Sequence, residues 1–232
     1  MNRSTLVLVH ALVTTLFVGL AGHIHASYVL PSGLSPGDQY RLVFVTSGAR
    51  DASSANIEDY NDFVKSYGDQ AVVSNWKAIV STATVDARDN TSSNPTTDGV
   101  GVPIYNLMGE LVADDYSDLW GGELKLPIKY NEEGTELFSW VWTGTSNDGT
   151  ALSDGVGSPS TTSSRGSSLG DADWSLKNNN NPLSVLDSFY GMSTVQTVEP
   201  EAVPEPASVI TWTLLGIVGY IGTLWNRRRK AG

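Results

Sequence analysis

The feature that most constrains this chain is an apolar segment close to its C-terminus. Residues 207–225 contain no charged side chain, and soon afterwards comes the basic run Arg227, Arg228, Arg229 and Lys230. About twenty apolar residues are the length that an α-helix needs to cross the hydrocarbon core of a membrane. The basic run is expected to stay on the cytoplasmic side. We therefore predict a transmembrane helix over residues 207–225 and a body that lies outside the cytoplasm.

The residues directly before this helix are Pro204, Glu205 and Pro206. A Pro-Glu-Pro motif, one spanning helix and a short Arg-rich end, in that order, resemble the PEP-CTERM sorting signal of bacterial exosortase substrates, here over residues 204–230. The resemblance implies that exosortase, a membrane-embedded and cysteine-dependent transpeptidase, recognises Pro204, Glu205 and Pro206, removes the helix and transfers the body onward. A permanent membrane anchor is the alternative.

The N-terminus has the pattern of a secretory signal. Arg3 precedes an apolar run over residues 6–20, and Ala26 is a suitable last residue before cleavage. We predict a signal peptide over residues 1–26, with an uncleaved anchor as the alternative. An extracytoplasmic domain over residues 27–198 and a short acidic linker over residues 199–203 would follow.

The body between the two ends is strongly acidic. Five of the 14 basic residues and one of the 25 acidic residues lie in the ends, which leaves 9 basic and 24 acidic side chains and a net charge of −15. Nucleic acid and anionic lipid surfaces are bound through basic patches, so we expect neither as a partner. An acidic surface of this kind fits a solvated extracellular protein.

The residue types that the body lacks exclude several kinds of chemistry. The chain has no cysteine, and its three histidines, His10, His23 and His25, all lie within the predicted signal peptide. The mature body would have neither Ser-His-Asp nor Cys-His catalysis and no zinc site of the usual ligands. We expect a protein that is not an enzyme.

The hydrophobic pattern predicts strands and one amphipathic helix. The helix spans residues 57–67, with an aromatic stripe facing the core, a cap at Ser53 or Ser54 and an end at Gly68. Residues 154–170 are rich in Gly, Ser and Thr and predict a surface loop, and 178–181 is a polar run. The predicted strands cover residues 40–46, 76–80 continued over 84–87, 102–107, 110–112, 123–128, 138–145 and 188–195.

The order of these segments resembles the endostatin domain of collagen. The resemblance rests on residues 76–80, 102–112, 119–120, 141–149 and Trp174. It implies a C-type-lectin-like α+β fold, a single domain with small antiparallel sheets, flanking helices and long loops. The chain lacks that family's disulfides, zinc histidines and basic glycan-binding surface. Zinc binding and heparin-like binding are therefore not implied.

Candidate sites are few. Calcium prefers oxygen ligands, and Asn147, Asp148, Asp171 and Asp173 are predicted to meet at the loop face of the fold. Asp114, Asp115 and Asp118 form a second acidic cluster, although acidic residues in ordinary surface turns are the alternative for both. No other cofactor is expected. Residues Asn90–Ser92 match a glycosylation sequon.

These observations together predict a bacterial surface or matrix protein that is exported and then processed by exosortase. Its body would be a non-catalytic module that binds exopolysaccharide or packs within it. Exposed Trp and Tyr side chains could stack on sugar rings, although core packing is expected for most of the five tryptophans of the body. A carboxylate-dependent carbohydrate-active enzyme and a coat component without a ligand are the alternatives.

Overall fold

The computed structural model describes residues 28–69, 75–200 and 215. The chain divides into two compact units, of which the larger contains residues 38–197 and holds every element discussed below. In the smaller unit the Gly37 amide donates to the Val198 carbonyl at 2.9 Å. The predicted signal peptide, the motif Pro204–Pro206, the predicted helix over 207–225 (apart from residue 215) and the basic run at 227–230 lie outside the described residues.

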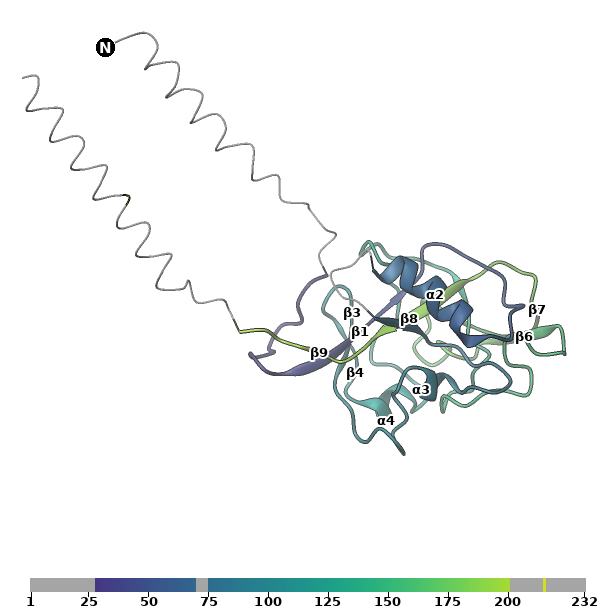
Figure 1. Cartoon of the computed structure of the whole chain (residues 1–232), viewed down its shortest axis with the longest axis horizontal. Helices are drawn as coiled ribbons and strands as arrows, with labels where there is room; N and C mark the ends of the chain where they lie inside the picture. The colour runs from purple at the N-terminus through teal and green to yellow at the C-terminus, as the bar shows by residue number, and fades with distance from the viewer. Residues whose placement is uncertain (1–27, 70–74, 201–214, 216–232) are drawn as a thin grey trace, which may run out of the picture. The chain divides into compact units, whose positions relative to one another are not determined.

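The larger unit is a sheet-rich α+β domain with short helices (Figure 1). The strands follow the order β4-β3-β1-β8-β5-β6-β7, with β2 paired to β8 and β9 paired to β1. Their bounds are β1 Gln39–Val45, β2 Trp76–Ala78, β3 Ile104–Asn106, β4 Leu111–Ala113, β5 Trp140–Trp142, β6 Thr162–Ser167, β7 Asn178–Pro182, β8 Ser188–Ser193 and β9 Gln196–Thr197. The helices are α2 Ile57–Gly68, α3 Ala87–Asn90 and α4 Tyr116–Leu119.

Strand β8 is the centre of the sheet. All six of its residues are buried, and it pairs with β1, β2 and β5. Two pairings are parallel, β1 with β3 and β5 with β8, whereas the others are antiparallel. The expectation of purely antiparallel sheets was therefore wrong, because long connections carry the chain back before β3 and before β8.

Helix α2 covers one face of β8. The ring of Tyr60 stacks on Phe189 with centroids 5.2 Å apart, and Phe63 meets the same ring edge-on at 5.7 Å. A Cβ at position 191 would come within 2.5 Å of Val64, so only glycine lets the helix lie this close to the strand. The predicted helix and its core-facing stripe are confirmed. The cap is different, since the Asn56 side chain, rather than that of Ser53 or Ser54, accepts from the Glu58 amide.

The other face of the sheet carries the larger core. Val43, Val45 and Tyr190 point into it from β1 and β8, and α3 and α4 contribute Ala87 and Leu119. Figure 1 shows α2 on one side of β1 and β8, with α3 and α4 on the other. The sheet is therefore covered on both faces near β8, whereas β7 lies at the far end of the strand order.

Three sequence expectations for local structure were wrong. Residues 84–87 do not continue β2, because Asp86 has the extended backbone of an N-cap and Ala87 begins α3. Residues 123–128 form no strand, since Leu124 and Ile128 are buried while Leu126 points outward, which breaks a two-residue alternation. The Ser-rich loop predicted over 154–170 contains β6, and the polar run at 178–181 is part of β7.

Candidate functional site

One tryptophan of the body differs from the other four in its exposure. The Trp76, Trp120, Trp142 and Trp174 side chains are buried, as core packing predicts, whereas Trp140 is 36% exposed. Phe138, two residues before it, is 76% exposed. Trp is enriched among the residues that contribute most to binding at protein interfaces. The start of β5 is therefore a candidate binding site.

Arg165 holds the ring of Trp140 from the neighbouring strand. The register of β5 and β6 pairs Trp142 with Arg165, which places the side chains of Trp140, Trp142 and Arg165 on the same face of the sheet. The guanidinium carbon lies 4.7 Å from the Trp140 ring centroid and 5.9 Å from that of Trp142. A cation at this distance is attracted to the ring face, so Arg165 stabilises this orientation of the Trp140 ring.

Asp187 balances the charge of Arg165. The Asp187 carboxylate accepts a hydrogen bond from Arg165 Nη1 at 2.8 Å, and the two side chains are only 10% and 14% exposed. Burial raises the pKa of Asp187, while the hydrogen bond and the positive charge of Arg165 act in the opposite direction. The pair leaves no net charge beneath the exposed ring.

The connection between β7 and β8 lies over these side chains. The indole nitrogen of Trp142 donates to the Val185 carbonyl at 3.2 Å. Arg50 and Asp187 exchange backbone hydrogen bonds, each at 3.1 Å, which fix the other side of the connection. Leu186, directly before Asp187, is 64% exposed. Trp140 lies against the neutralised ion pair, and exposed Phe138 and Leu186 are close to the two sides of the pair in sequence. We call Phe138, Trp140, Arg165, Leu186 and Asp187 the Trp140 face.

Sequence reasoning placed neither Arg165 nor Asp187 in a site. The two residues are 22 positions apart, in segments whose composition gives no strand or apolar pattern. Only the pairing of β5 with β6 brings Arg165 to the tryptophans. An isolated arginine inside a Ser- and Gly-rich segment was the one available signal.

The predicted calcium ligands all have partners in the protein, and that of Asn147 is Ser175, 28 positions away in the segment that carries Asp171 and Asp173. Asp173 forms an ion pair with Lys177 at 3.0 Å, and the Asn147 side chain accepts from the Ser175 hydroxyl at 2.9 Å. Asp171 accepts from the Ala172 amide. Over residues 28–69 and 75–200, no three acidic or histidine side chains form a group suited to a metal ion. Calcium binding at Asn147, Asp148, Asp171 and Asp173 therefore stays a prediction.

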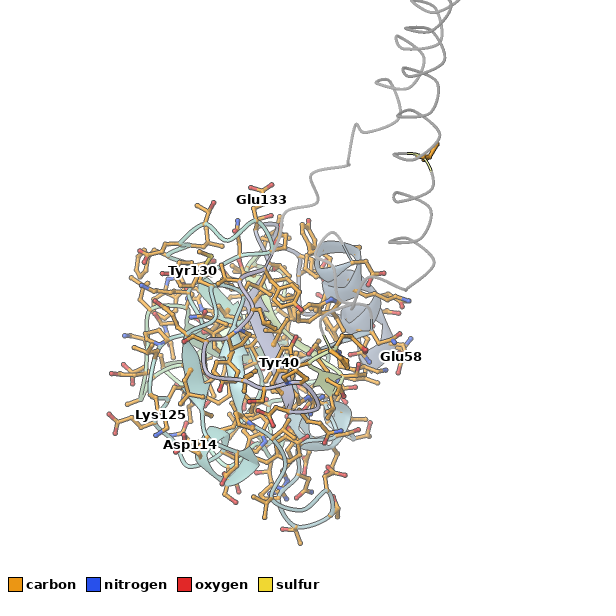
Figure 2. The ribbon with its side chains drawn as sticks, turned by 90° about the vertical axis from the view of Figure 1, so that its left-hand side faces the viewer. Tyr40, Glu58, Asp114, Lys125, Tyr130 and Glu133 are labelled. Carbon is orange, nitrogen blue, oxygen red and sulfur yellow. The ribbon has the colours of Figure 1, made fainter. Side chains whose placement is uncertain are left out.

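The second acidic cluster serves local structure. Asp115 caps α4 by accepting from the Asp118 amide at 2.8 Å, and Asp118 in turn accepts from the Asp114 amide at 2.8 Å. Asp114 forms an ion pair with Lys125 at 2.9 Å, and Figure 2 shows these two side chains together at the surface. This arrangement agrees with the alternative of acidic residues in ordinary turns.

Asp148 gives a prediction that depends on pH. Hydrogen bonds from Ser146 and Thr150 lower the pKa of Asp148 from 3.8 to about 2. Its stabilising contribution is therefore fully present above pH 3.8 and is lost as the pH falls through about 2. Because Asp148 is exposed, we expect Asp148→Ala to lower the free energy of unfolding near neutral pH by only about 1 kcal/mol.

Urea denaturation at neutral pH and near pH 2 measures this difference. The difference in the free energy of unfolding between the wild type and Asp148→Ala should be smaller in acid than at neutral pH. Asp154→Ala, on the next turn, serves as the matched control. A gap that is equally large at both pH values would contradict the role given to the carboxylate.

The sequon at Asn90 is not presented for modification. The Asn90 amide nitrogen donates to the Ala78 carbonyl at 2.7 Å and to the Asn61 side chain at 2.9 Å. Asn61 also accepts from the Ala78 amide at 2.9 Å, so the two asparagines join α2, α3 and β2. The side chain that would carry a glycan is therefore occupied in the folded domain.

In the part of the chain that the structure describes, no helix is both long and apolar enough for a membrane span. A scan against protein-family models finds no match, and a search of curated proteins finds none either.

Proposed function

We propose that this protein is an exported surface or matrix protein whose body binds exopolysaccharide without catalysing a reaction. The observation that carries the binding role is the Trp140 face. An exposed indole held against Arg165 offers a flat apolar surface, and the neutralised Arg165–Asp187 pair adds no net charge. The apolar face of a sugar ring can stack on such a surface, as large aromatic side chains do in other binding sites.

Export and sorting rest on the ends of the chain. The N-terminal signal and the tail over residues 204–230 support secretion followed by exosortase processing at Pro204, Glu205 and Pro206. Before processing, the helix over residues 207–225 would anchor the protein in the membrane, with Arg227–Lys230 on the cytoplasmic side.

For the fold, we propose a C-type-lectin-like, endostatin-like body. Support comes from the order of its aromatic segments and from the α+β domain with short helices and long connections. A fold of this kind hosts many functions, so the binding role depends on the Trp140 face and not on the fold.

A binding role fits the available side chains better than the enzymatic alternative. The chain beyond residue 25 has neither histidine nor cysteine, so acid–base chemistry would fall to carboxylates. At the Trp140 face the carboxylate is that of Asp187, and it forms an ion pair with Arg165. A pair of free carboxylates at a set separation, as glycoside hydrolysis requires, is not what this face offers.

Replacing Trp140 with alanine tests the binding role. We expect affinity for exopolysaccharide from the native cells to fall about tenfold or more, because an aromatic anchor at a binding site contributes roughly 1.4 kcal/mol or more. Affinity electrophoresis of the full-length chain in gels containing that polysaccharide measures the change.

The matched control is Leu126→Ala, because Leu126 is a comparably exposed apolar residue (40%) outside the Trp140 face. Leu126→Ala should bind as the wild type does. Equal retardation of the wild type and Trp140→Ala would contradict the proposed site. Release of reducing sugar from the polysaccharide would favour the enzyme instead.

A further inference from the structure

A hollow lies beside the connection between β7 and β8, which covers Trp142. It has a volume of about 510 Å³ and lies where β6 begins and β7 ends. Its polar lining consists of hydroxyl groups, from Ser53, Ser158, Thr161, Thr162 and Ser184. Pro159, Pro182 and Leu183 supply apolar surface, and none of the lining residues is charged. Its volume falls within the range of roughly 300–1,000 Å³ that is typical of small-molecule sites.

This lining selects the class of ligand. A hydroxyl both donates and accepts hydrogen bonds, so it can meet a ligand hydroxyl in either role. The Thr161 and Ser184 side chains are exposed and that of Thr162 is half-buried, so a ligand in the hollow can reach these hydroxyls. An uncharged molecule with many hydroxyls and some apolar C–H surface matches the hollow, and a neutral sugar has both.

The walls of the hollow are fixed by the protein itself. The Leu183 amide donates to the Thr161 carbonyl at 3.0 Å, and the Ala52 amide donates to the Leu183 carbonyl at 2.8 Å. Thr161 has a φ of 61°, a left-handed conformation that is rare for a β-branched residue. Such strained residues persist where the surroundings hold them, and they cluster at binding sites. The hollow is therefore formed before a ligand arrives.

The same connection borders both the hollow and the Trp140 face. Leu183 and Ser184 line the hollow, while Leu186 and Asp187 belong to the Trp140 face. Along β6, Ser167 pairs with Trp140 and Thr162 lies at the hollow. Five residues of strand span about 16 Å, which is longer than one sugar ring. A chain of several sugars is long enough to reach from one place to the other.

We propose that the hollow is a second subsite for the same neutral polysaccharide chain that stacks on Trp140, which rests on the function proposed above. The protein then recognises an internal stretch of several uncharged sugars rather than a terminal sugar. Its affinity rises with the length of the oligosaccharide until both places are filled.

The test is isothermal titration of the full-length chain in mild detergent. The probes are two neutral series, glucan and mannan oligosaccharides, each from the disaccharide to a long oligomer. The subsite variant is the double substitution Thr162→Val and Ser184→Ala, which removes two hydroxyls and nearly keeps the shape. The Trp140→Ala variant and the wild type are measured beside it.

The subsite predicts that wild-type affinity rises with chain length. It also predicts that the affinity of the double variant for the long oligomer is about tenfold lower than that of the wild type. Its affinity for the shortest ligand that binds should equal that of the wild type. If Trp140→Ala loses binding while the double variant matches the wild type at every length, the subsite is overturned and the Trp140 face stands. If the wild type binds no member of either series, both the subsite and a neutral-glycan function are overturned.

Discussion

Replacing Arg41 with methionine is expected to lower the free energy of unfolding by about 4 kcal/mol or more, because each buried acceptor left without a donor costs roughly 1–3 kcal/mol. Arg41 lies on β1 and is 3% exposed. Its Nε donates to the Ser193 carbonyl at 2.7 Å, its Nη2 to the Thr91 carbonyl at 2.6 Å and its Nη1 to the Ser92 carbonyl at 3.0 Å. One side chain therefore joins β1, β8 and the turn after α3.

Arg41 is a buried charged group, so it needs hydrogen-bond partners within the protein. Burial lowers the pKa of the Arg41 guanidinium, since the charged form is removed from water. Its hydrogen bonds go to three backbone carbonyls and to the hydroxyl of Tyr116, whose ring centroid also lies 5.6 Å from the guanidinium carbon. Methionine fills much of the volume but supplies no donor, so the loss is one of hydrogen bonds rather than of packing.

Urea denaturation followed by circular dichroism measures the loss. Arg41→Lys should be intermediate, because a single ammonium group cannot reach all three carbonyls on two separate segments as the planar guanidinium does. The matched control is Lys125→Met, which breaks an exposed ion pair and should cost about 0.5 kcal/mol or less. If Arg41→Met costs no more than Lys125→Met, the role given to Arg41 is wrong.

Replacing Gly166 with alanine is also expected to have a large effect. It should lower the free energy of unfolding by about 3 kcal/mol or more, because the added methyl group overpacks the site. Gly166 pairs with Val141 in the β5–β6 ladder. A Cβ at position 166 would lie 1.6 Å from the carbonyl oxygen of Trp174 and 2.4 Å from its carbonyl carbon. Because both atoms are backbone, relief requires that the segment around Trp174 move away from the sheet.

The segment around Trp174 is not free to move. The Ser175 carbonyl accepts from the Thr143 hydroxyl at 2.5 Å, and the Asp173 carbonyl accepts from the Ser167 amide at 3.2 Å. The Trp174 ring also lies in the core, 6.0 Å from the Tyr190 ring. Any shift that makes room for a methyl group at position 166 breaks these contacts.

The control for Gly166→Ala is Gly99→Ala, and thermal denaturation compares the two. A Cβ at position 99 meets nothing within 4 Å, although its φ of 78° is left-handed. Alanine there should cost only about 1–2 kcal/mol of backbone strain. Similar losses at the two positions would contradict the close approach of β6 to Trp174.

Much of the fold could be predicted wherever apolar spacing reports burial. Such apolar spacing is present in α2, in the strands β1 and β8, and in the hairpin of β3 and β4 about Gly109. The positions of these elements are confirmed. Strand β6 could not be found in this way. Its buried residues Ser163, Ser164 and Gly166 are small, and at Gly166 the Trp174 backbone leaves no room for a side chain. Small polar residues resemble a loop in the sequence.

The candidate site was only partly accessible from the sequence. Trp140 and Trp142 lie two residues apart and share one face of β5, so their pattern cannot tell which ring is buried. The difference arises because the β7–β8 connection covers Trp142 and leaves Trp140 open. The Arg165–Asp187 pair forms only through strand pairing, and no local pattern reports it. The hydroxyl-lined hollow likewise requires three segments that are distant in sequence.

The proposed function requires that the protein work outside the cytoplasm as a released module. The most direct measurement is the intact mass of the protein recovered from the outer surface of its native cells. We predict a mass that corresponds to a chain without residues 1–26, ending between Val203 and Pro206, with or without an attached group. A mass that still includes residues 207–230 would show that the tail is a permanent anchor and would contradict the proposed processing.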